Sequence, residues 1–523
     1  MDKTANKKEE LILTIDSGTQ SIRAALVNLK GEILEIVKTP IEPYFSKNPG
    51  WAEQKPEYYW EMLCKTCRSL FEQTGDLKEN IIGVSVTTLR NTIVNVDKNG
   101  DSLRPAIVWM DQRKADSKNI LPSVLRPVLK AARVHDFIDG LVCDCEANWI
   151  CQNQPDLWDK TYKYLLLSGY FNFKLTNEFL DSVGSNVGYL PINNKTYQWA
   201  GKYDFKWKLF KVEKEKLPDL VKPGESMGQI TAKASEETGI PKGLPVIAAA
   251  SDKACEILGA GCLTPETACL SFGTLASINT ATSRYVELQP FLPPFPSAVP
   301  DLYYTEVQLI RGFWMVSWFK EQFGHKERKE ALEEHVIPEI LFERLIRAVP
   351  PGSMGLVLHP HWTPGPSTAF YAKGSIIGFG DVHTRAHVYR AIIEGLIFGL
   401  KEGALLTEKK NKVPITRLRI SGGGSLSDTA MQTAADIFGK PAQRPLTHET
   451  SIVGAAIDAA VGLKRFPDFE VAVKEMTGVK EVFDPIEKNN QMYQELYERV
   501  YSKISKQLMP LFKAIQEITG YPE

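Results

Sequence analysis

Blocks of apolar residues separated by short polar turns run along this chain, and the first of them predicts a β-hairpin. Residues 11–29 read LILTIDSGTQSIRAALVNL, two apolar runs of strand length joined by a turn rich in glycine and hydroxyl side chains. Residues 268–280, ACLSFGTLASINT, repeat the device in the other half of the chain around Gly273 and Thr274. The repetition predicts two similar domains, although either turn alone is also compatible with an ordinary hairpin.

Short strands and amphipathic helices alternate through the rest of the first half, which is typical of the α/β class. The pattern predicts strands over 33–37, 81–87, 92–97 and 106–109 and a helix over 56–72. The segment from about 116 to 216 is less regular, with helices predicted over 147–152 and 158–175. We therefore expect this segment to be an insertion on the first domain.

The second half keeps the alternation of strand and helix. The pattern predicts a strand over 246–250, a helix over 253–258 closed by Gly259, a strand over 418–420, a helix ending at Gly439, a long helix within 374–402 and helices beyond 484. A chain of 523 residues is too long for one ordinary core. We expect an N-terminal domain over 1–260 and a C-terminal domain over 261–523.

The composition is that of a globular protein with a small substrate. Hydrophobic residues make up 43% and charged residues 24% of the chain. The net charge of −1, without a long basic block, lacks the electrostatic footprint of a nucleic-acid-binding protein. No apolar run approaches the roughly 20 residues that span a membrane. The charged start, MDKTANKKEE, precedes no signal-like apolar segment, so we expect a cytoplasmic protein.

Eight cysteines are too few for a dense disulfide framework in a chain of this length. Cys64 and Cys67 form a C-x-x-C within a helical pattern, and Cys143, Cys145 and Cys151 cluster further on. A zinc site is conceivable, but the first pair has no well-spaced second pair. Free thiols in a reducing compartment fit the pattern better.

Two predicted junctions carry candidate chemistry. In the first turn, backbone N–H groups and the hydroxyls of Thr19 and Ser21 could surround a phosphate, and Asp16 could hold its Mg²⁺. Asp252 follows a predicted strand and opens a helix, at the usual ligand edge of an α/β sheet, so it could act as a general base. The alternative is that Asp252 only caps the helix.

A glycine-rich turn, SGGGS at 421–425, lies between a predicted strand and a predicted helix. Its glycines would allow the backbone to approach a flat or anionic ligand closely. The turn is not the G-x-G-x-x-G fingerprint of a dinucleotide fold, and the chain contains no G-x-x-x-x-G-K-[ST] loop. Those two common phosphate-binding motifs are therefore excluded.

Several motifs together resemble the FGGY carbohydrate kinases in order and spacing. They are IDSGTQSIRAAL, LRPAIVWMDQR, ASDKACEILGAG, CLSFGTLASI and ISGGGSLSDTAMQTAADIFGKP, spread over roughly residues 11–463. The resemblance implies two RNase H-like domains of the actin-like ATPase fold, hinged around a central cleft. It also implies transfer of the γ-phosphate of ATP to a hydroxyl of a sugar, ketose or polyol.

The resemblance further implies roles for individual residues. Asp16 resembles the family acid that coordinates Mg²⁺, and Asp252 the catalytic base that takes the proton of the attacking hydroxyl. The first turn, with Gly18, Thr19, Gln20 and Ser21, resembles the first phosphate loop of the family. The second turn, with Gly273 and Thr274, resembles the second phosphate loop. The adenosine-binding turn resembles Gly423 and Gly424, with Ser427 and Gln432 as weaker candidates.

The acceptor pocket of the family resembles the set Arg90, Asn91, Trp109, Asp252 and Lys253. Arg90 is similar to the arginine that contacts polyol hydroxyls in glycerol kinases, but those enzymes carry Glu at the position of Asn91 and Gln at that of Lys253. The Met-His-Gly of xylulokinases is absent as well. An amide donates as well as accepts hydrogen bonds, and a buried mismatch costs about 1–3 kcal/mol, so glycerol is a doubtful acceptor.

Alternatives remain open beside this interpretation. Residues 359–370 and the Pro-rich PFLPPFPSAVP before them depart from the family and could shape the pocket or a subunit contact; homodimers are common among relatives. His387 and Glu394 are expected to serve packing. The alternative functions are a strict glycerol or tetritol kinase, an actin-like ATPase that acts as a nucleotide switch without an acceptor, and a redox-linked ATPase activator with a metal cluster on cysteines. Arg90 and Trp109 beside Asp252 favour a kinase, because a switch needs no acceptor pocket.

Overall fold

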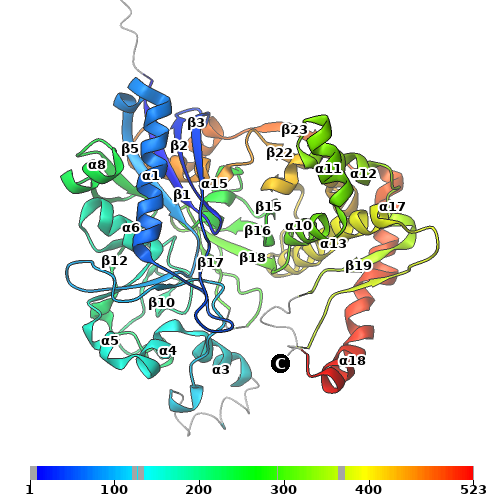
Figure 1. The fold of residues 1–523 in the computed structure, drawn as a ribbon, viewed down its shortest axis with the longest axis horizontal. Helices are drawn as coiled ribbons and strands as arrows, with labels where there is room; N and C mark the ends of the chain where they lie inside the picture. The colour runs from blue at the N-terminus through cyan, green and yellow to red at the C-terminus, as the bar shows by residue number, and fades with distance from the viewer. Residues whose placement is uncertain (1–8, 121–126, 128–134, 291, 363–370, 522–523) are drawn as a thin grey trace, which may run out of the picture. The chain divides into compact units, whose positions relative to one another are not determined.

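The computed structural model describes residues 9–120, 127, 135–290, 292–362 and 371–521 and divides the chain into two compact units (Figure 1). Unit 1 comprises Met1–Gly259, Phe295–Tyr303 and Ser451–Thr477. Unit 2 comprises Ala260–Pro294, Tyr304–Thr450 and Gly478–Glu523. The chain thus first passes from one unit to the other after Gly259, and two later segments return to unit 1. Part of the departing segment 359–370, residues 363–370, lies outside the described residues.

Unit 1 is built on a six-stranded sheet in the order β13-β14-β5-β1-β2-β3. Its strands are β1 (Leu11–Ser17), β2 (Ser21–Asn28), β3 (Ile33–Pro40), β5 (Ile81–Thr88), β13 (Ser226–Gln229) and β14 (Pro245–Ala248). β1 is antiparallel to β2 and parallel to β5, and β5 is parallel to β14. Every residue of β1 is buried, as expected for a central strand covered on both faces. The predicted first hairpin is confirmed.

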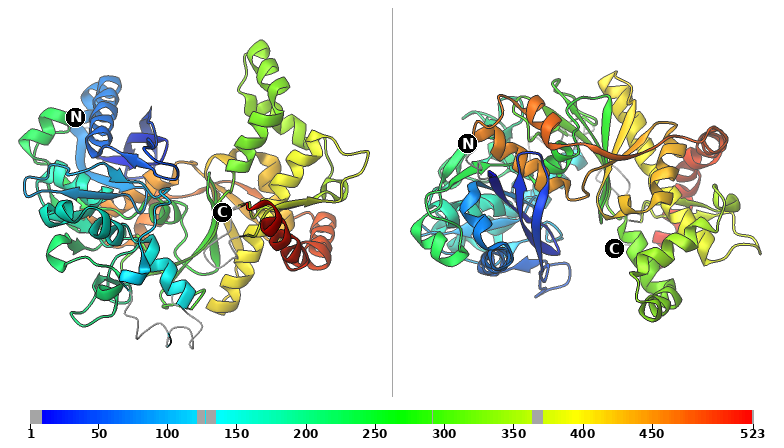
Figure 2. Two further views of the ribbon diagram at one scale, coloured as in Figure 1. Left: turned by 60° about the horizontal axis from the view of Figure 1, so that its bottom comes forward. Right: turned by 90° about the horizontal axis from the view of Figure 1, so that it is seen from above.

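The predicted first helix is α1 (Pro56–Thr74), which packs against β2 and β3 (Figures 1 and 2). Proline opens it at a position where no backbone N–H is needed. Its buried face includes Cys64 and Cys67, which lie in the core of unit 1. Burial raises the pKa of the Cys64 thiol to about 12. All eight cysteines are free thiols in the structure.

One predicted helix in the insertion is wrong. Residues 158–175 form the end of α5 (Pro155–Lys160), then strand β8 (Lys163–Leu166), then most of α6 (Leu167–Thr176). β8 pairs with β6 (Ile93–Val96) in a second sheet, β4-β7-β6-β8. The apolar residues of β8 are buried by this pairing, so a long-range partner overrides the helical pattern of the local sequence.

The remaining elements of unit 1 surround these two sheets. The short strands are β4 (Glu53–Gln54), β7 (Ala106–Ile107), β9 (Leu180–Ser182), β10 (Ile192–Asn193), β11 (Gln198–Trp199), β12 (Asp219–Val221) and β17 (Phe295–Pro296). The helices are α3 (His135–Asp144), α4 (Glu146–Asn153), α7 (Lys206–Leu209), α8 (Ala232–Thr238), α9 (Asp252–Gly259), α15 (Thr450–Gly462) and α16 (Phe469–Met476). The insertion has its own hydrophobic core, built mainly by residues 93–217.

Unit 2 repeats the sheet of unit 1. Six strands of its seven-stranded sheet follow the order β18-β16-β15-β21-β22-β23, which matches β3-β2-β1-β5-β14-β13 position by position. The bounds are β15 (Thr267–Phe272), β16 (Ala276–Thr282), β18 (Tyr303–Leu309), β21 (Arg417–Ser421), β22 (Ala442–Pro445) and β23 (Val479–Phe483). β15 is antiparallel to β16 and parallel to β21, so the second predicted hairpin is confirmed.

Helices of unit 2 pack around this sheet and a long central helix, α13 (Arg385–Asn411), whose inner turns are almost wholly buried. The others are α10 (Trp314–Phe323), α11 (His325–Glu334), α12 (Pro338–Arg347), α14 (Asp428–Phe438), α17 (Glu487–Leu496) and α18 (Ser502–Thr519), with strands β19 (Val357–His359) and β20 (Ser375–Ile377). The helical pattern predicted beyond 484 is confirmed. Among the described residues, no helix is long and apolar enough to cross a bilayer.

Candidate functional site

The first predicted phosphate loop is the turn between β1 and β2. Gly18, Thr19 and Gln20 form the turn, and the Gly18 N–H donates to the Ser21 carbonyl at 3.0 Å. The Trp109 indole N–H donates to Thr19 Oγ1 at 3.2 Å. This contact brings a predicted acceptor residue and the predicted phosphate loop together within unit 1.

Asp16, the candidate metal ligand, lies near the end of β1 and is only 4% exposed. Its Oδ2 is 3.1 Å from Arg23 Nη1 and accepts a 2.8 Å hydrogen bond from the Ser451 hydroxyl of α15. A carboxylate in this position is a hard oxygen donor of the kind that Mg²⁺ prefers. Ser451 lies 435 residues further along the chain, so no local pattern could have predicted its contact with Asp16.

Asp252, the candidate base, is the first residue of α9 and follows β14 after three residues. Its half-buried carboxylate accepts a 2.7 Å hydrogen bond from the N–H of Lys253. Burial raises the pKa of Asp252 to about 6, although the charges of Arg90 and Lys253 lower it, and the charge of Asp16 raises it further. The structure thus gathers four of the predicted site residues closely enough for their charges to interact.

The loop after β5 carries Arg90 and Asn91, two of the predicted acceptor residues, and is here called the acceptor loop; aromatic and polar contacts hold it. The Arg90 guanidinium lies 4.8 Å from the centre of the Phe295 ring, in the Pro-rich segment that joins unit 1. Asn91 has a positive φ of 54°, a conformation that asparagine tolerates better than most residues. A Cβ at Gly188 would lie 2.3 Å from Asn91 Oδ1, so Gly188 packs directly on this loop.

Glu146 is a residue of this loop's surroundings that the sequence did not single out. Asn91 Nδ2 donates to Glu146 Oε1 at 2.9 Å, and Glu146 is only 8% exposed in the first turn of α4. Burial raises the pKa of Glu146 to about 7. A carboxyl group therefore does lie beside Asn91, supplied by the insertion. The predicted Lys253 forms a 2.7 Å ion pair with Glu256 of its own helix.

The second predicted phosphate loop and the glycine-rich turn lie together in unit 2. Gly422 has a φ of +80°, and a Cβ there would lie 3.0 Å from the backbone of Phe272 and 3.2 Å from the Gly273 nitrogen. The carbonyls of Gly273 and Thr274 accept hydrogen bonds from the N–H groups of residues 313 and 314, at 3.0 and 3.3 Å. The turn after β21 is thus packed against the turn after β15.

The two predicted adenosine glycines differ in their surroundings. A Cβ at Gly424 would lie 2.6 Å from the ring of Phe313, so packing within the protein already requires glycine there. A Cβ at Gly423 would meet nothing within 4 Å. Only Gly423 therefore has open space beside it that a ligand could use.

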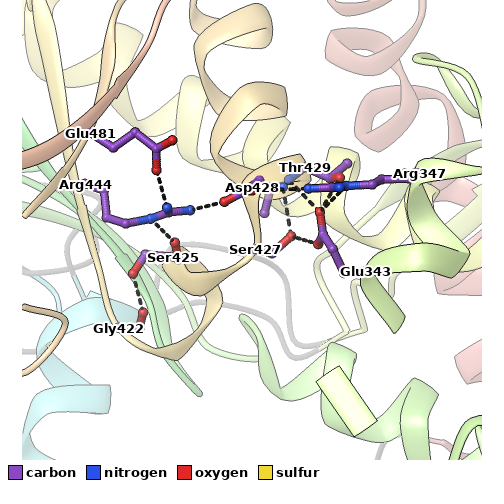
Figure 3. Close-up of polar contacts among 10 residues, drawn as sticks. Glu343, Arg347, Gly422, Ser425, Ser427, Asp428, Thr429, Arg444 and Glu481 are labelled. Atoms are coloured by element: carbon purple, nitrogen blue, oxygen red, sulfur yellow. Dashed lines mark hydrogen bonds and ion pairs between the residues drawn. The ribbon is translucent and has the colours of Figure 1, made fainter. Parts of the chain in front are cut away.

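Ser427 and its neighbours form a polar cluster at the start of α14 (Figure 3). The Ser427 side chain accepts from the Ala430 N–H and donates to Glu343, which also accepts from Thr429. Ser427 thus serves as a helix cap with a second bond to a carboxylate. The Asp428 carboxylate pairs with Arg444 at 2.7 Å and Arg347 at 3.2 Å.

A cavity of about 620 Å³ adjoins this cluster within unit 2. Among its lining residues are Arg347, Pro350, Asp428, Gln432, Phe483 and Asn489. Gln432 donates to Asp436 and to the carbonyl of Asp484. A cavity of this size with both apolar and polar lining suits a small ligand of nucleoside dimensions.

The two polar residues on α13 have partners within unit 2. Thr384 and His387 form a reciprocal cap at the start of α13. Glu394 is buried and accepts hydrogen bonds from Arg390, Tyr493, Ser353 and the N–H of Gly352. Glu394 therefore serves packing within unit 2, as predicted, whereas His387 caps the start of its own helix.

Comparisons with known proteins agree with the fold. The N-terminal domain of the FGGY family of carbohydrate kinases matches residues 11–259, and the C-terminal domain of that family matches residues 268–463. The uncharacterised sugar kinase YgcE of Escherichia coli is 30% identical over 511 residues, covering 98% of this chain and 96% of the relative. A xylulose kinase of Staphylococcus epidermidis is 28% identical over 515 residues, covering 98% of this chain and all of the relative.

Solved structures give the same answer about the fold. The crystal structure of a xylulose kinase from Rhodospirillum rubrum has a TM-score of 0.80 at 24% sequence identity and covers 96% of this chain and 100% of that one. Such FGGY kinases have the actin-like ATPase fold, and the duplicated sheet of units 1 and 2 is consistent with it. On the match of both domain models, this chain belongs to the FGGY family of carbohydrate kinases and is an enzyme that phosphorylates a sugar.

Proposed function

We propose that the chain transfers the γ-phosphate of ATP to a hydroxyl of a sugar, ketose or polyol, with Asp252 as the general base. The observation that carries the proposal is the setting of Asp252 at the start of α9, where burial raises its pKa to about 6 and the charges of Arg90, Lys253 and Asp16 act on it. Because ATP is the donor, we expect the enzyme to act in the cytoplasm.

Asp252 suits this role because a sugar hydroxyl is a weak nucleophile that must lose its proton as it attacks phosphorus. A carboxylate with a pKa near 6 is ionised at neutral pH and is more basic than an ordinary aspartate. The Lys253 N–H fixes one carboxylate oxygen at 2.7 Å, which limits the orientation of the other. Asp252 would therefore accept the proton and orient the hydroxyl for in-line attack.

Asp16 is the residue that we propose to hold the divalent metal of the family. Mg²⁺ binds proteins through one or two carboxylates and keeps water and substrate phosphates as its other ligands, so one buried carboxylate is sufficient. No group of three or more candidate metal-ligating side chains occurs in the described part of the chain. When bound, the metal neutralises charge on the phosphate oxygens. Ser451 and Arg23 hold Asp16 in place.

We propose that unit 2 binds the nucleotide. The turn of Gly273 and Thr274 offers backbone N–H groups and a hydroxyl to phosphate oxygens. The open space beside Gly423 would admit part of the nucleoside close to the backbone, and the 620 Å³ cavity that Asp428 and Gln432 line would take the base. Glycine at 423 is then needed for the ligand, whereas glycine at 422 and 424 is needed for the protein.

The acceptor that we propose is a ketose or polyol longer than glycerol. The Asn91 amide and the Glu146 carboxyl group form a hydrogen-bonded pair in the loop that carries Arg90. This pair offers substrate hydroxyls both donors and acceptors, whereas a single carboxylate offers acceptors alone. The similarity to a xylulose kinase supports a longer acceptor. Trp109, which is 36% exposed, would supply an apolar surface for the carbon chain.

Release of ADP tests the proposal. The purified protein is incubated with ATP and Mg²⁺ and with polyols, ketoses, aldoses and sugar acids of three to seven carbon atoms. We expect one acceptor class to stimulate ADP release in the wild type and in Asp159→Asn, a matched change on the exposed side of α5, but not in Asp252→Asn. Hydrolysis that no acceptor stimulates would favour a nucleotide switch instead.

A further inference from the structure

A second buried aspartate lies beneath the junction that carries Asp252. Asp458 of α15 is fully buried, and its Oδ2 is 3.8 Å from the Cys255 sulfur, within hydrogen-bonding distance for a thiol. The backbone of Ala250 lowers the pKa of the Asp458 carboxyl group and so opposes the effect of burial. Ala250 and Cys255 flank Asp252 on either side. The carboxyl group of Asp458 therefore interacts with the chain both before and after the candidate base.

The peptide group of Ala250 is held from a second direction as well. The Thr87 hydroxyl donates to the Ala250 carbonyl at 2.8 Å, and the Cys255 sulfur lies 3.4 Å from the same oxygen. Thr87 belongs to the neighbouring strand β5. Side chains from β5, α9 and α15 thus hold the residues between β14 and α9 in place.

Helix α15 lies against this junction without space for side chains between them. A Cβ at Gly454 would lie 1.9 Å from the Cys255 carbonyl oxygen. A Cβ at Gly462 would lie 2.3 Å from the Gly224 carbonyl and 2.6 Å from Ile247 of β14. Gly454, in the second turn of α15, and Gly462, at its end, therefore set a close contact with α9 and β14.

The same helix also reaches the candidate metal ligand. Ser451, in the first turn of α15, donates its hydroxyl hydrogen bond to Asp16 at 2.8 Å. Ser451 and Asp458 are seven residues apart, about two helical turns, so they lie on one face of α15. Helix α15 thus contacts the Asp16 carboxylate directly, and it contacts Cys255, which lies three residues after Asp252.

Burial of a carboxyl group at position 458 costs desolvation free energy unless its contacts offset that cost. Its side chain has no solvent access, and its Oδ1 has no hydrogen-bond partner among the described residues. Burial raises the pKa of Asp458 well above its ordinary value. An apolar side chain would avoid this desolvation cost but would lose the contact with the Cys255 thiol.

We infer that α15 is a brace for the active site, in which Asp458 and Ser451 are positioning residues for Asp252 and Asp16. The inference rests on the proposed function of those two carboxylates. Neither positioning residue touches substrate; each acts through the geometry of the group it holds. Displacement of a catalytic group by about 1 Å costs up to about 100-fold in rate, which is the scale of effect we expect.

Three variants test the brace. Asp458→Ala removes the contact, Asp458→Asn keeps an oxygen that can accept from the Cys255 thiol, and Asn95→Ala is the control. Asn95 is also buried, with an unpartnered Oδ1, but lies on β6 in the other sheet of unit 1. We expect kcat to fall about 10- to 100-fold in Asp458→Ala with the KM for ATP within about twofold. Asp458→Asn should restore kcat to within about threefold, and Asn95→Ala should leave it within about twofold.

Amide hydrogen exchange gives a readout that does not depend on activity. Peptides covering residues 246–258 should exchange faster in Asp458→Ala than in the wild type, and no faster in Asn95→Ala. Unchanged exchange there, or an equal loss of kcat in Asp458→Ala and Asn95→Ala, would overturn the brace. If the wild type shows no acceptor-dependent turnover, the proposed function fails, and faster exchange in Asp458→Ala alone would still support the structural brace.

Discussion

The sheets of units 1 and 2 have the same strand order but carry different residue types at corresponding strand ends. Near the end of β1 stands Asp16, and at the corresponding register of β15 stands Ser271. After β5 comes Arg90, whereas after β21 come Gly422 and Gly423. The comparison teaches that the duplicated topology provides equivalent positions, and that the residue types placed there decide the function. We propose that unit 1 uses them for acid, base and acceptor, and unit 2 for the nucleotide.

The second difference between the units is the insertion. In unit 1 a second, four-stranded sheet, β4-β7-β6-β8, and the helices α3 and α4 are added, and all of these elements except β4 lie between β5 and β14 in the sequence. This insertion supplies Glu146 to the acceptor loop through Asn91. If the assignment is correct, substitutions in unit 1 should change turnover and acceptor choice, and substitutions in unit 2 should change the affinity for ATP.

The largest effect should come from the base in unit 1. Asp252→Asn should lower kcat by about 10²- to 10⁴-fold, because the amide cannot accept the hydroxyl proton. Binding of ATP, measured by calorimetry, should stay within about threefold of the wild type if unit 2 holds the nucleotide. Near-normal turnover would leave Asp252 as a residue of the helix start only.

A change in the acceptor loop should have the next largest effect. Asn91→Glu places a second carboxylate beside Glu146 at a positive φ, so kcat/KM for the best acceptor should fall by about 10- to 100-fold, the equivalent of about 1–3 kcal/mol. Adding Glu146→Gln should recover part of the loss and improve use of glycerol. The matched control is Asn177→Glu, the same change at an exposed residue with a φ of 64°. Equal losses in both single variants would point to backbone strain alone.

The pH dependence of kcat/KM should show which carboxyl group must be ionised for turnover. The base works only when ionised, and the pKa of Asp252 is raised to about 6, so kcat/KM should fall roughly tenfold per pH unit below that value and level off above it. Glu146 also has a raised pKa, of about 7. The acidic limb should therefore persist in Glu146→Gln. Its disappearance in that variant would assign the titration to Glu146.

The smallest effects should separate the glycines of unit 2. Gly423→Ala has room within the protein, so it should fold normally but raise the KM for ATP by about three- to tenfold if the nucleoside lies there. Gly422→Ala has a φ of +80° and a close backbone neighbour, so it should lower the free energy of unfolding by about 1–2 kcal/mol. Thermal unfolding and ATP titration distinguish the two. An unchanged KM in Gly423→Ala would remove the nucleoside from this turn.

Local patterns in the sequence predicted both hairpins because alternating strands and glycine turns are encoded by neighbouring residues. The strand β8 was wrongly predicted as helix because its partner β6 lies far away in the sequence. Glu146, Ser451 and Asp458 were missed for the same reason, since each contacts the site through a residue distant in the chain. The only signal for Glu146 was an acid directly before the helix predicted over 147–152.

The position of the Pro-rich segment in the fold could not be predicted from the sequence either. Its composition showed that it departs from the family, but not that Phe295 lies under the Arg90 guanidinium. Asp252 was found because it follows a predicted strand and opens a predicted helix, and Arg90 because it resembles the arginine of glycerol kinases. Asp458 lies within an ordinary apolar helix, TSIVGAAIDAAVG, where a single acid resembles a surface residue until the packing is known.

Transfer of labelled phosphate from ATP tests the central claim most directly. The enzyme is given ATP labelled at the γ-phosphate and the best acceptor of the panel, and the label is followed into acceptor phosphate and inorganic phosphate. We predict that the label appears on the acceptor with the wild type and with Asp159→Asn, and not with Asp252→Asn. Label found only in inorganic phosphate with the wild type and Asp252→Asn alike would contradict the assignment of Asp252 as the base of a sugar kinase.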